Sequence, residues 1–240
     1  MNVSFAQLSA TFRESSFYVT GNPLAEALLP TRFLFRFAAP CLRFDGGWTA
    51  KGCELGEAHR LPSLTEIDGQ RGYADVRAGW SDAGLFFTAA VTGKKQPLWC
   101  RENKLEDSDG LQLWIDTRDT HNIHRASRFC HRFAFLPAGG GRQFTEAVAD
   151  QLLVDRAREN AQPVRPGLLK VHSAIKKDGY QLAIHLPAAA LTGFNPIDNP
   201  KLGFTYYLFD REFAEQTFSS GTQFPFAADP SLWGTLELVK

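Results

Sequence analysis

Residues 105–120 read LEDSDGLQLWIDTRDT, and the alternating run at their centre, GLQLWID (110–116), decides the fold. Successive side chains of a β-strand point to opposite faces, so every second residue of this run lies on the same side. One face consists of Leu111, Leu113 and Ile115. The other face consists of Gln112, Trp114 and Asp116. The sequence therefore predicts a strand with one side in a hydrophobic core, while its other side meets either an open groove or a covering loop.

Further strand-like runs follow one another at short intervals, with turn residues between them. They lie at 31–40, 73–80, 85–93, 132–137, 143–149, 168–187, 202–210 and 232–240. The segment SDAG (81–84) predicts one hairpin, and Asp178-Gly179 within 168–187 predicts another. No helical period of useful length occurs after residue 40.

This pattern predicts an all-β fold, an antiparallel β-sandwich of the jelly-roll or immunoglobulin-like kind. We expect one sandwich domain over residues 31–240. Residues 1–30 form a short N-terminal extension, in which Asn22 and Pro23 favour a brief helix at 22–29.

Composition excludes several classes of partner. The chain has 26 basic and 26 acidic residues, so it has no net field that would favour nucleic acid or an anionic membrane surface. It has no apolar run of about twenty residues, which a transmembrane helix needs, and its N-terminus lacks the pattern of a secretory signal. As written, it is expected to be cytoplasmic, with its 4 cysteines as free thiols.

Several segments, taken in order, resemble the family-9 carbohydrate-binding modules and the wider DOMON-like sandwich group. These segments are LRFDGGW (42–48), ADVRAGWSDAGLFFTAAVTG (74–93), DSDGLQLWID (107–116), DGYQLAIHLPAAALTG (178–193), LGFTYYLFDRE (202–212) and DPSLWGTLELV (229–239). The resemblance covers roughly residues 40 to 240. It implies a β-sandwich that binds a saccharide in a groove, by aromatic stacking and hydrogen bonds to hydroxyls, without catalysis.

The family's site residues match only in part. Its two clamping tryptophans are replaced: Glu106-Asp107 precedes the acidic strand, with Trp99 the nearest tryptophan, and Phe224 or Phe226 occupies the later place. The acidic residue within the strand is matched by Gln112. The family's arginine on the following strand is matched by Arg132, with Arg128 as a rival.

Sugar recognition needs flat aromatic surfaces edged by groups that donate and accept hydrogen bonds. The residues that fit this requirement are Trp99, Arg101, Asp109, Gln112, Trp114, Arg118, Arg132 and Phe226. Trp114 has a structural alternative, which is to pack under a loop. Core packing is expected for Trp48, Trp80 and Trp233. The arginines of 118–132 would also suit an acidic sugar.

The acids of the opening stretch allow other interpretations. Residues 106–109 offer part of a calcium site, although the EF-hand spacing is absent. Asp107 and Asp109 could form a glycosidase pair, but two residues on an extended chain meet that distance by geometry alone. A structural role is also open, in which Asp109 or Asp116 accepts hydrogen bonds from backbone amides.

Cofactor sites find little support. Cys130 and His131 are adjacent on an extended run and point to opposite faces, which disfavours a zinc site. Met1 is the only methionine, which argues against methionine-ligated haem. No cofactor is therefore expected, with calcium as the exception. Two rivals to sugar binding remain: a structural or protein-interaction sandwich that has lost the sugar site, and a hydrolase acting on glycans.

Overall fold

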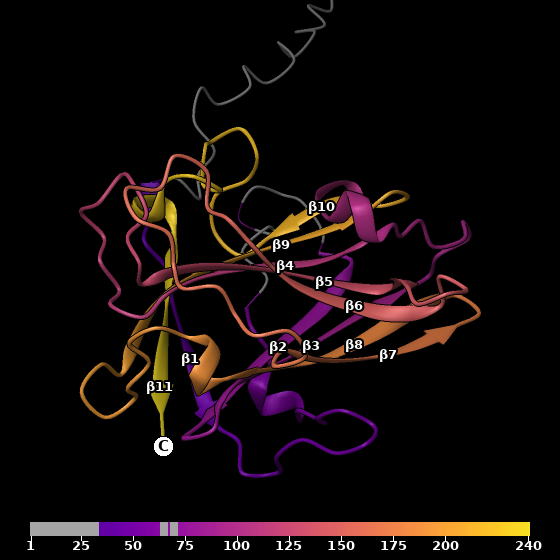
Figure 1. Cartoon of the computed structure of the whole chain (residues 1–240), viewed down its shortest axis with the longest axis horizontal. Helices are drawn as coiled ribbons and strands as arrows, with labels where there is room; N and C mark the ends of the chain where they lie inside the picture. Colours follow the sequence, from indigo (N-terminus) through magenta and orange to yellow (C-terminus); the bar gives the residue numbers. More distant parts are fainter. Residues whose placement is uncertain (1–33, 63–66, 68–71) are drawn as a thin grey trace, which may run out of the picture.

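A computed structural model of the chain describes residues 34–62, 67 and 72–240. The predicted N-terminal extension, 1–30, and its short helix lie outside the described residues. All strands of the described residues belong to one 11-stranded sheet, in the order β6-β5-β4-β9-β11-β1-β2-β3-β8-β7, with β10 paired to β9 (Figure 1). The strands are β1 (Ala38–Arg43), β2 (Ala74–Ser81), β3 (Gly84–Thr92), β4 (Gly110–Asp116), β5 (Cys130–Gly140), β6 (Glu146–Leu152), β7 (Lys170–Lys176), β8 (Gly179–Pro187), β9 (Lys201–Asp210), β10 (Ala214–Thr217) and β11 (Gly234–Val239).

The sheet bends into two layers, which confirms the predicted sandwich. In Figure 1, β4, β5, β6, β9 and β10 form one layer and β2, β3, β7 and β8 the other, while β11 and β1 run steeply between them. The prediction of antiparallel pairing holds for every pair except two. β1 is parallel to both β11 and β2, because it joins the layers and is not part of a hairpin.

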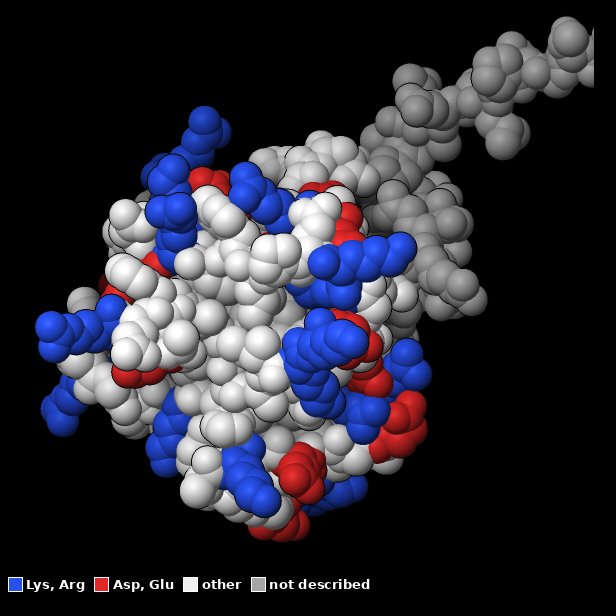
Figure 2. All heavy atoms as spheres, turned by 90° about the vertical axis from the view of Figure 1, so that its right-hand side faces the viewer, with Lys and Arg blue, Asp and Glu red and all other residues white. Residues whose placement is uncertain are grey.

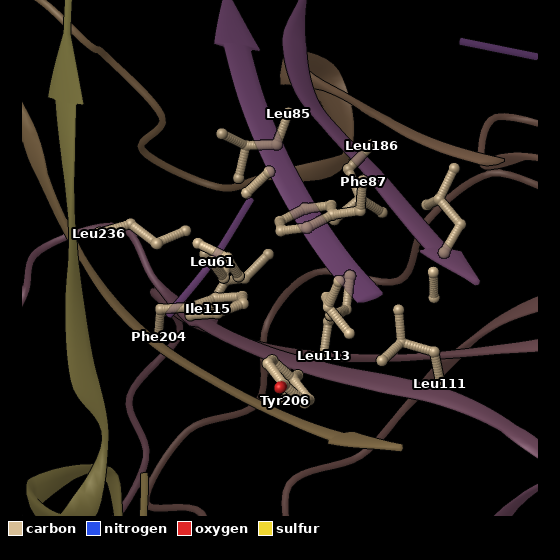
Figure 3. Packing of buried hydrophobic residues seen from close by; sticks show 14 of the residues in the cluster. Leu61, Leu85, Phe87, Leu111, Leu113, Ile115, Leu186, Phe204, Tyr206 and Leu236 are labelled. Atoms are coloured by element: carbon tan, nitrogen blue, oxygen red, sulfur yellow. The ribbon is translucent and has the colours of Figure 1, made fainter. Parts of the chain in front are cut away.

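The core between the layers contains the predicted apolar face of β4. Leu111 and Leu113 lie across from Phe87 and Leu186 of the other layer (Figure 3). Fully burying one such side chain contributes roughly 1.5–3 kcal/mol. The alternation of GLQLWID therefore fixes which side of β4 faces inward.

Glycines close two tight hairpins. Ser81 pairs with Gly84 and Lys176 with Gly179, so each turn has two residues. Gly84 (φ 134) and Gly179 (φ 158) lie so close to the backbone of a neighbouring strand that a Cβ would collide with it. The predicted hairpin at Asp178 is confirmed, with its turn at Lys177-Asp178, one residue earlier than expected.

Three sequence expectations differ from the structure. The run at 31–40 is not a strand in its described first half; β1 begins at Ala38, and Phe35 is exposed. The short β10 has no counterpart among the predicted runs. Trp80 and Trp233 are buried as expected, but Trp48 is only half-buried and lies outside the main core.

All 4 cysteines lie in the described part of the chain and none forms a disulfide, as predicted. Figure 2 shows one end of the molecule, where basic and acidic side chains are interspersed around an uncharged centre. Within the described residues, no helix has the length and apolar character needed to cross a membrane.

His131 makes stability depend on pH. Its side chain is 1% exposed on the core face of β5, and burial lowers its pKa from 6.5 to about 4. The unfolded chain takes up this proton below about 6.5, whereas the folded chain resists it until about 4, so stability is lost as pH falls through this window. We expect a loss on the order of 3 kcal/mol, measured by urea unfolding at a series of pH values.

His131→Phe provides the control for this prediction, because a phenyl ring can retain the stacking on Phe133. The variant should lose most of the slope of stability against pH between 6.5 and 4. An unchanged slope would assign the pH dependence to other groups, such as His185, whose pKa is also lowered by burial.

Candidate functional site

The outer face of β4 is covered by loops. Trp114 is 1% exposed, its indole N–H donates to the Ala227 carbonyl at 3.2 Å, and its ring meets Phe226 edge-on at 5.3 Å. Ala126, Cys130, Val154 and Trp233 complete this outer cluster. Trp114 thus takes the structural alternative: it packs under a loop and offers no open ring face.

Arg132 on β5 is the centre of a buried polar group on this face. It pairs directly with Trp114 across the β4–β5 ladder, and its guanidinium lies 4.9 Å from the centre of that ring. One Nη donates to Gln112 Oε1 at 2.7 Å and lies 2.5 Å from Glu106 Oε1. Arg132 is 6% exposed, and its Nε has no hydrogen-bond partner within the described residues.

The two candidate arginines lie in different places. Arg132 contacts Gln112 on the outer face of the sheet. Arg128 lies instead in the loop before β5, where its guanidinium covers the Phe129 ring and comes within 4.0 Å of Glu159.

Tyr207 and Phe209 of β9 form a half-buried aromatic strip beside this group. Their rings are stacked at 6.1 Å with an interplanar angle of 8°. Tyr207 pairs with Gln112, and Phe209 pairs with Gly110, which has no side chain to cover it. Burial raises the pKa of the Tyr207 hydroxyl, and the nearby charges of Glu215 and Asp107 raise it further. The strip thus combines flat rings with acceptors at its edge.

Trp99 lies at the start of the loop that leads to β4. Its ring is half-buried and carries two guanidinium groups, from Arg101 at 5.4 Å and Arg211 at 4.6 Å. Ser108 holds the loop in place by accepting from the Arg101 amide and donating to the Lys104 carbonyl. The carboxylate of Glu106 extends from this loop, within η4 (Glu102–Asp107), to Arg132.

Asp109 is fully buried in a charged cluster beneath the loop. Its carboxylate accepts from the amides of Trp99 and Arg211 and lies 3.3 Å from Lys94 Nζ. The same ammonium bonds both oxygens of Asp210, at 2.5 and 2.6 Å. This is the structural role foreseen for Asp109, since every contact of its carboxylate fixes the backbone or neutralises charge.

Two predicted residues lie at the far end of β4. Asp116 accepts from the amides of Arg118 and Thr120, and burial raises the pKa of its carboxyl. The Arg118 guanidinium covers the Phe129 ring at 4.5 Å and donates to the Gly193 carbonyl. Arg118 therefore contacts this loop and lies away from the Gln112–Arg132 pair.

The alternative chemistries lack a suitable arrangement. Among the described residues no three of His, Cys, Asp and Glu converge as metal ligands. Cys130 and His131 point to opposite faces, as predicted. Asp107 is exposed whereas Asp109 is fully buried, so the two do not share a cleft as a glycosidase pair must.

Two hydroxyl–histidine–carboxylate groups occur elsewhere among the described residues. In one, Thr235 and Asp119 both meet Nε2 of His121, at 3.2 and 2.9 Å. The other lies around η6 (Pro230–Leu232) and has the same arrangement. Ser231 and Asp229 both meet the same nitrogen of His124, Nδ1, at 3.2 and 3.1 Å. A nucleophilic relay needs the hydroxyl and the carboxylate on different ring nitrogens. Neither group therefore matches a hydrolase triad.

Of the predicted residues, Gln112, Trp114, Arg132 and Phe226 come together on one face. Trp99, Arg101 and Asp109 gather in the adjoining loop, and Arg118 is at the other end. Sequence reasoning missed Tyr207, Phe209 and Glu106. The alternation of LGFTYYLFD could have placed Tyr207 and Phe209 opposite the core, but the pairing of β9 with β4 was not readable from it.

In architecture the chain is similar to β-sandwich carbohydrate-binding modules of family 9. One solved module, from Caldicellulosiruptor kristjanssonii in complex with cellotriose, matches with a TM-score of 0.54 at 12% identity, over 85% of this chain and 94% of that one. The glucose complex from the same organism gives 0.56 at 12% identity, over 84% and 95%.

A Bacteroides uniformis protein for which carbohydrate binding has been proposed matches with a TM-score of 0.54 at 12% identity, over 85% of this chain and 100% of that one. At such identities the similarity establishes the fold. No family model and no curated protein matches the sequence.

Proposed function

We propose that the protein is a non-catalytic saccharide-binding domain, whose ligand lies against Tyr207 and Phe209 of β9, beside the loops that cover the outer face of β4. The observation that carries the proposal is the Gln112–Arg132 pair set beside the stacked rings of Tyr207 and Phe209. Sugars present apolar C–H patches edged by hydroxyls, and this face offers two half-buried rings whose position is fixed by the buried Gln112–Arg132 pair beside them. The match to sugar-bound family-9 folds supports saccharide binding by this fold.

The ion pair of Arg132 favours a neutral sugar. The Arg132 guanidinium is buried, whereas its partner Glu106 is 62% exposed. A ligand that displaced Glu106 would leave the buried guanidinium without a counter-charge, which is costly, and a hydroxyl cannot replace the charge of Glu106. The ligand therefore leaves Glu106 on Arg132 and stacks on the tyrosine ring. Asp107 and Glu215, whose charges act on Tyr207, supply acceptors at the rim. Trp114 and Phe226 support the site from below.

We expect Tyr207→Ala to weaken saccharide binding about fivefold, because loss of a stacking ring costs on the order of 1 kcal/mol. Isothermal titration with glucose, cellotriose and a panel of neutral oligosaccharides would measure this. Phe144→Ala is the matched control, since its ring is 69% exposed in the β5–β6 turn, and it should bind like the wild type.

Equal affinities for Tyr207→Ala and the wild type would place the ligand elsewhere. A wild-type protein that binds no sugar of the panel would instead favour the interaction-domain rival, which is consistent with the burial of Trp114 and Gln112.

A further inference from the structure

A second hollow lies on the outer face of the opposite layer. It has a volume of about 440 Å³ and lies between the end of β1, the β2–β3 turn and β8. Figure 1 places β2, β3 and β8 in the layer opposite β4, β5 and β9. A volume of this size is within the range of small-molecule sites, and the proposed Tyr207 site does not include any residue that lines it.

Aromatic rings form the floor of this hollow. Phe86 and His185 are stacked at 4.4 Å with an angle of 5°, and Trp48 stacks on the same histidine at 6.2 Å. Of the 5 tryptophans, Trp80, Trp114 and Trp233 are buried. Trp99 is half-buried beneath two guanidinium groups. Trp48, in contrast, is half-buried and its ring lines the open hollow.

A short turn presents Trp48 in this position. Thr49 and Gly52 exchange two backbone hydrogen bonds of 3.0 Å. Gly52 has a positive φ of 86°, and a Cβ there would collide with Ala183 of β8 and come within 3.3 Å of His172 of β7. The glycine therefore lets the turn lie directly against the sheet, which holds the indole in place over His185.

The charges around the hollow balance. Arg43 bonds Asp45 at 2.9 Å and Asp82 at 2.8 Å, and Lys170 is the other cation on the wall. Two cations and two anions have no net preference for a charged ligand. Their donors and acceptors at the edge of an indole suit a polyhydroxylated neutral molecule.

His185 forms a buried part of the same wall. It is 6% exposed, and both of its ring nitrogens lie below the surface. Burial lowers its pKa; a hydrogen bond with the backbone of Ala83 acts in the opposite direction, and Lys170 lowers the pKa further. The imidazole therefore supports the Trp48 ring from beneath, and the exposed polar groups of the hollow are those of Arg43, Asp45, Asp82 and Lys170.

We propose that the Trp48–His185 hollow is a second binding site for a neutral saccharide, independent of the Tyr207 site. The pyranose stacks on Trp48, and its hydroxyls bond the Arg43–Asp82 pair and Lys170. The two sites lie on opposite faces of the sandwich, so one domain can hold two sugar chains or two segments of one chain.

The indole N–H signals of ¹⁵N-tryptophan-labelled protein test this inference, with Trp48→Phe used to assign the Trp48 signal. Titration with cellotriose and the neutral oligosaccharide panel should shift the Trp48 signal in the wild type and equally in Tyr207→Ala. Isothermal titration follows binding in Trp48→Ala, which lacks the Trp48 signal. This variant should bind sugar at the hollow at least about tenfold more weakly, while binding at the Tyr207 site stays unchanged.

Lys170→Ala keeps the test decisive if Trp48→Ala fails to fold, because Lys170 is exposed and its removal leaves the rings in place. Lys170→Ala should lower the sugar affinity reported by the Trp48 signal several-fold and leave the affinity of the Tyr207 site unchanged. A Trp48 signal that no sugar of the panel shifts would overturn the second site. A shift that disappears in Tyr207→Ala would also overturn it, since the sites would then not be independent.

Discussion

Replacing Lys94 by methionine is expected to lower the free energy of unfolding by about 3 to 5 kcal/mol. Among the described residues, the Lys94 ammonium is the only cation that forms an ion pair with Asp109 and Asp210. Both carboxylates are 0% exposed. Methionine fills most of the space but leaves two buried anions unpaired. Urea unfolding at neutral pH would measure the loss.

Lys95→Met is the matched control, because Lys95 is the adjacent lysine and is exposed; it should change stability by less than about 0.5 kcal/mol. Adding Asp210→Asn to Lys94→Met should recover part of the loss, since it removes one of the stranded charges. Strict additivity of the two substitutions would show that the three groups do not act as a cluster.

Trp114→Ala should cost about 3 to 5 kcal/mol of stability, as expected for truncating a fully buried tryptophan. The indole fills the outer cluster beneath Phe226 and supports the guanidinium of Arg132. The cavity would loosen the covering loops and leave Arg132 without its platform. Urea unfolding and the sugar titrations described above, on the same variant, would separate the two consequences.

Trp99→Ala is the comparison for this prediction, because Trp99 is half-buried at the surface. Its loss of stability should be about 1 kcal/mol. If Trp114→Ala were as stable as Trp99→Ala, the loops would not cover β4 and the groove predicted as an alternative would be open.

The candidate site was predicted in part because alternation and chemistry are local properties. Gln112 and Arg132 were both named as candidates, and the strand that carries each was found, but their contact was not predicted. The exposure of these side chains to solvent could not be derived from the local sequence pattern. Whether Trp114 meets solvent depends on residues such as Phe226 and Trp233, which are more than a hundred positions away in the chain.

The acids of the opening stretch show the same division. Five carboxylates at 106–119 resemble a single feature in the sequence. In the fold they separate: Asp109 joins Lys94, Glu106 bonds Arg132, and Asp116 holds the turn that follows β4. Their partners are distant along the chain or depend on the backbone path, so composition alone could not assign them.

By itself, the sequence determined the all-β class, the hairpins and the inward face of β4, because side-chain alternation and turn residues act over a few positions. Only the tertiary structure decided the parallel pairing of β1, the covering of Trp114, the placing of Tyr207 beside Gln112, and the hollow at Trp48. Each of these requires two segments that are distant in sequence to meet, and such meetings are set by the packing of the whole sheet.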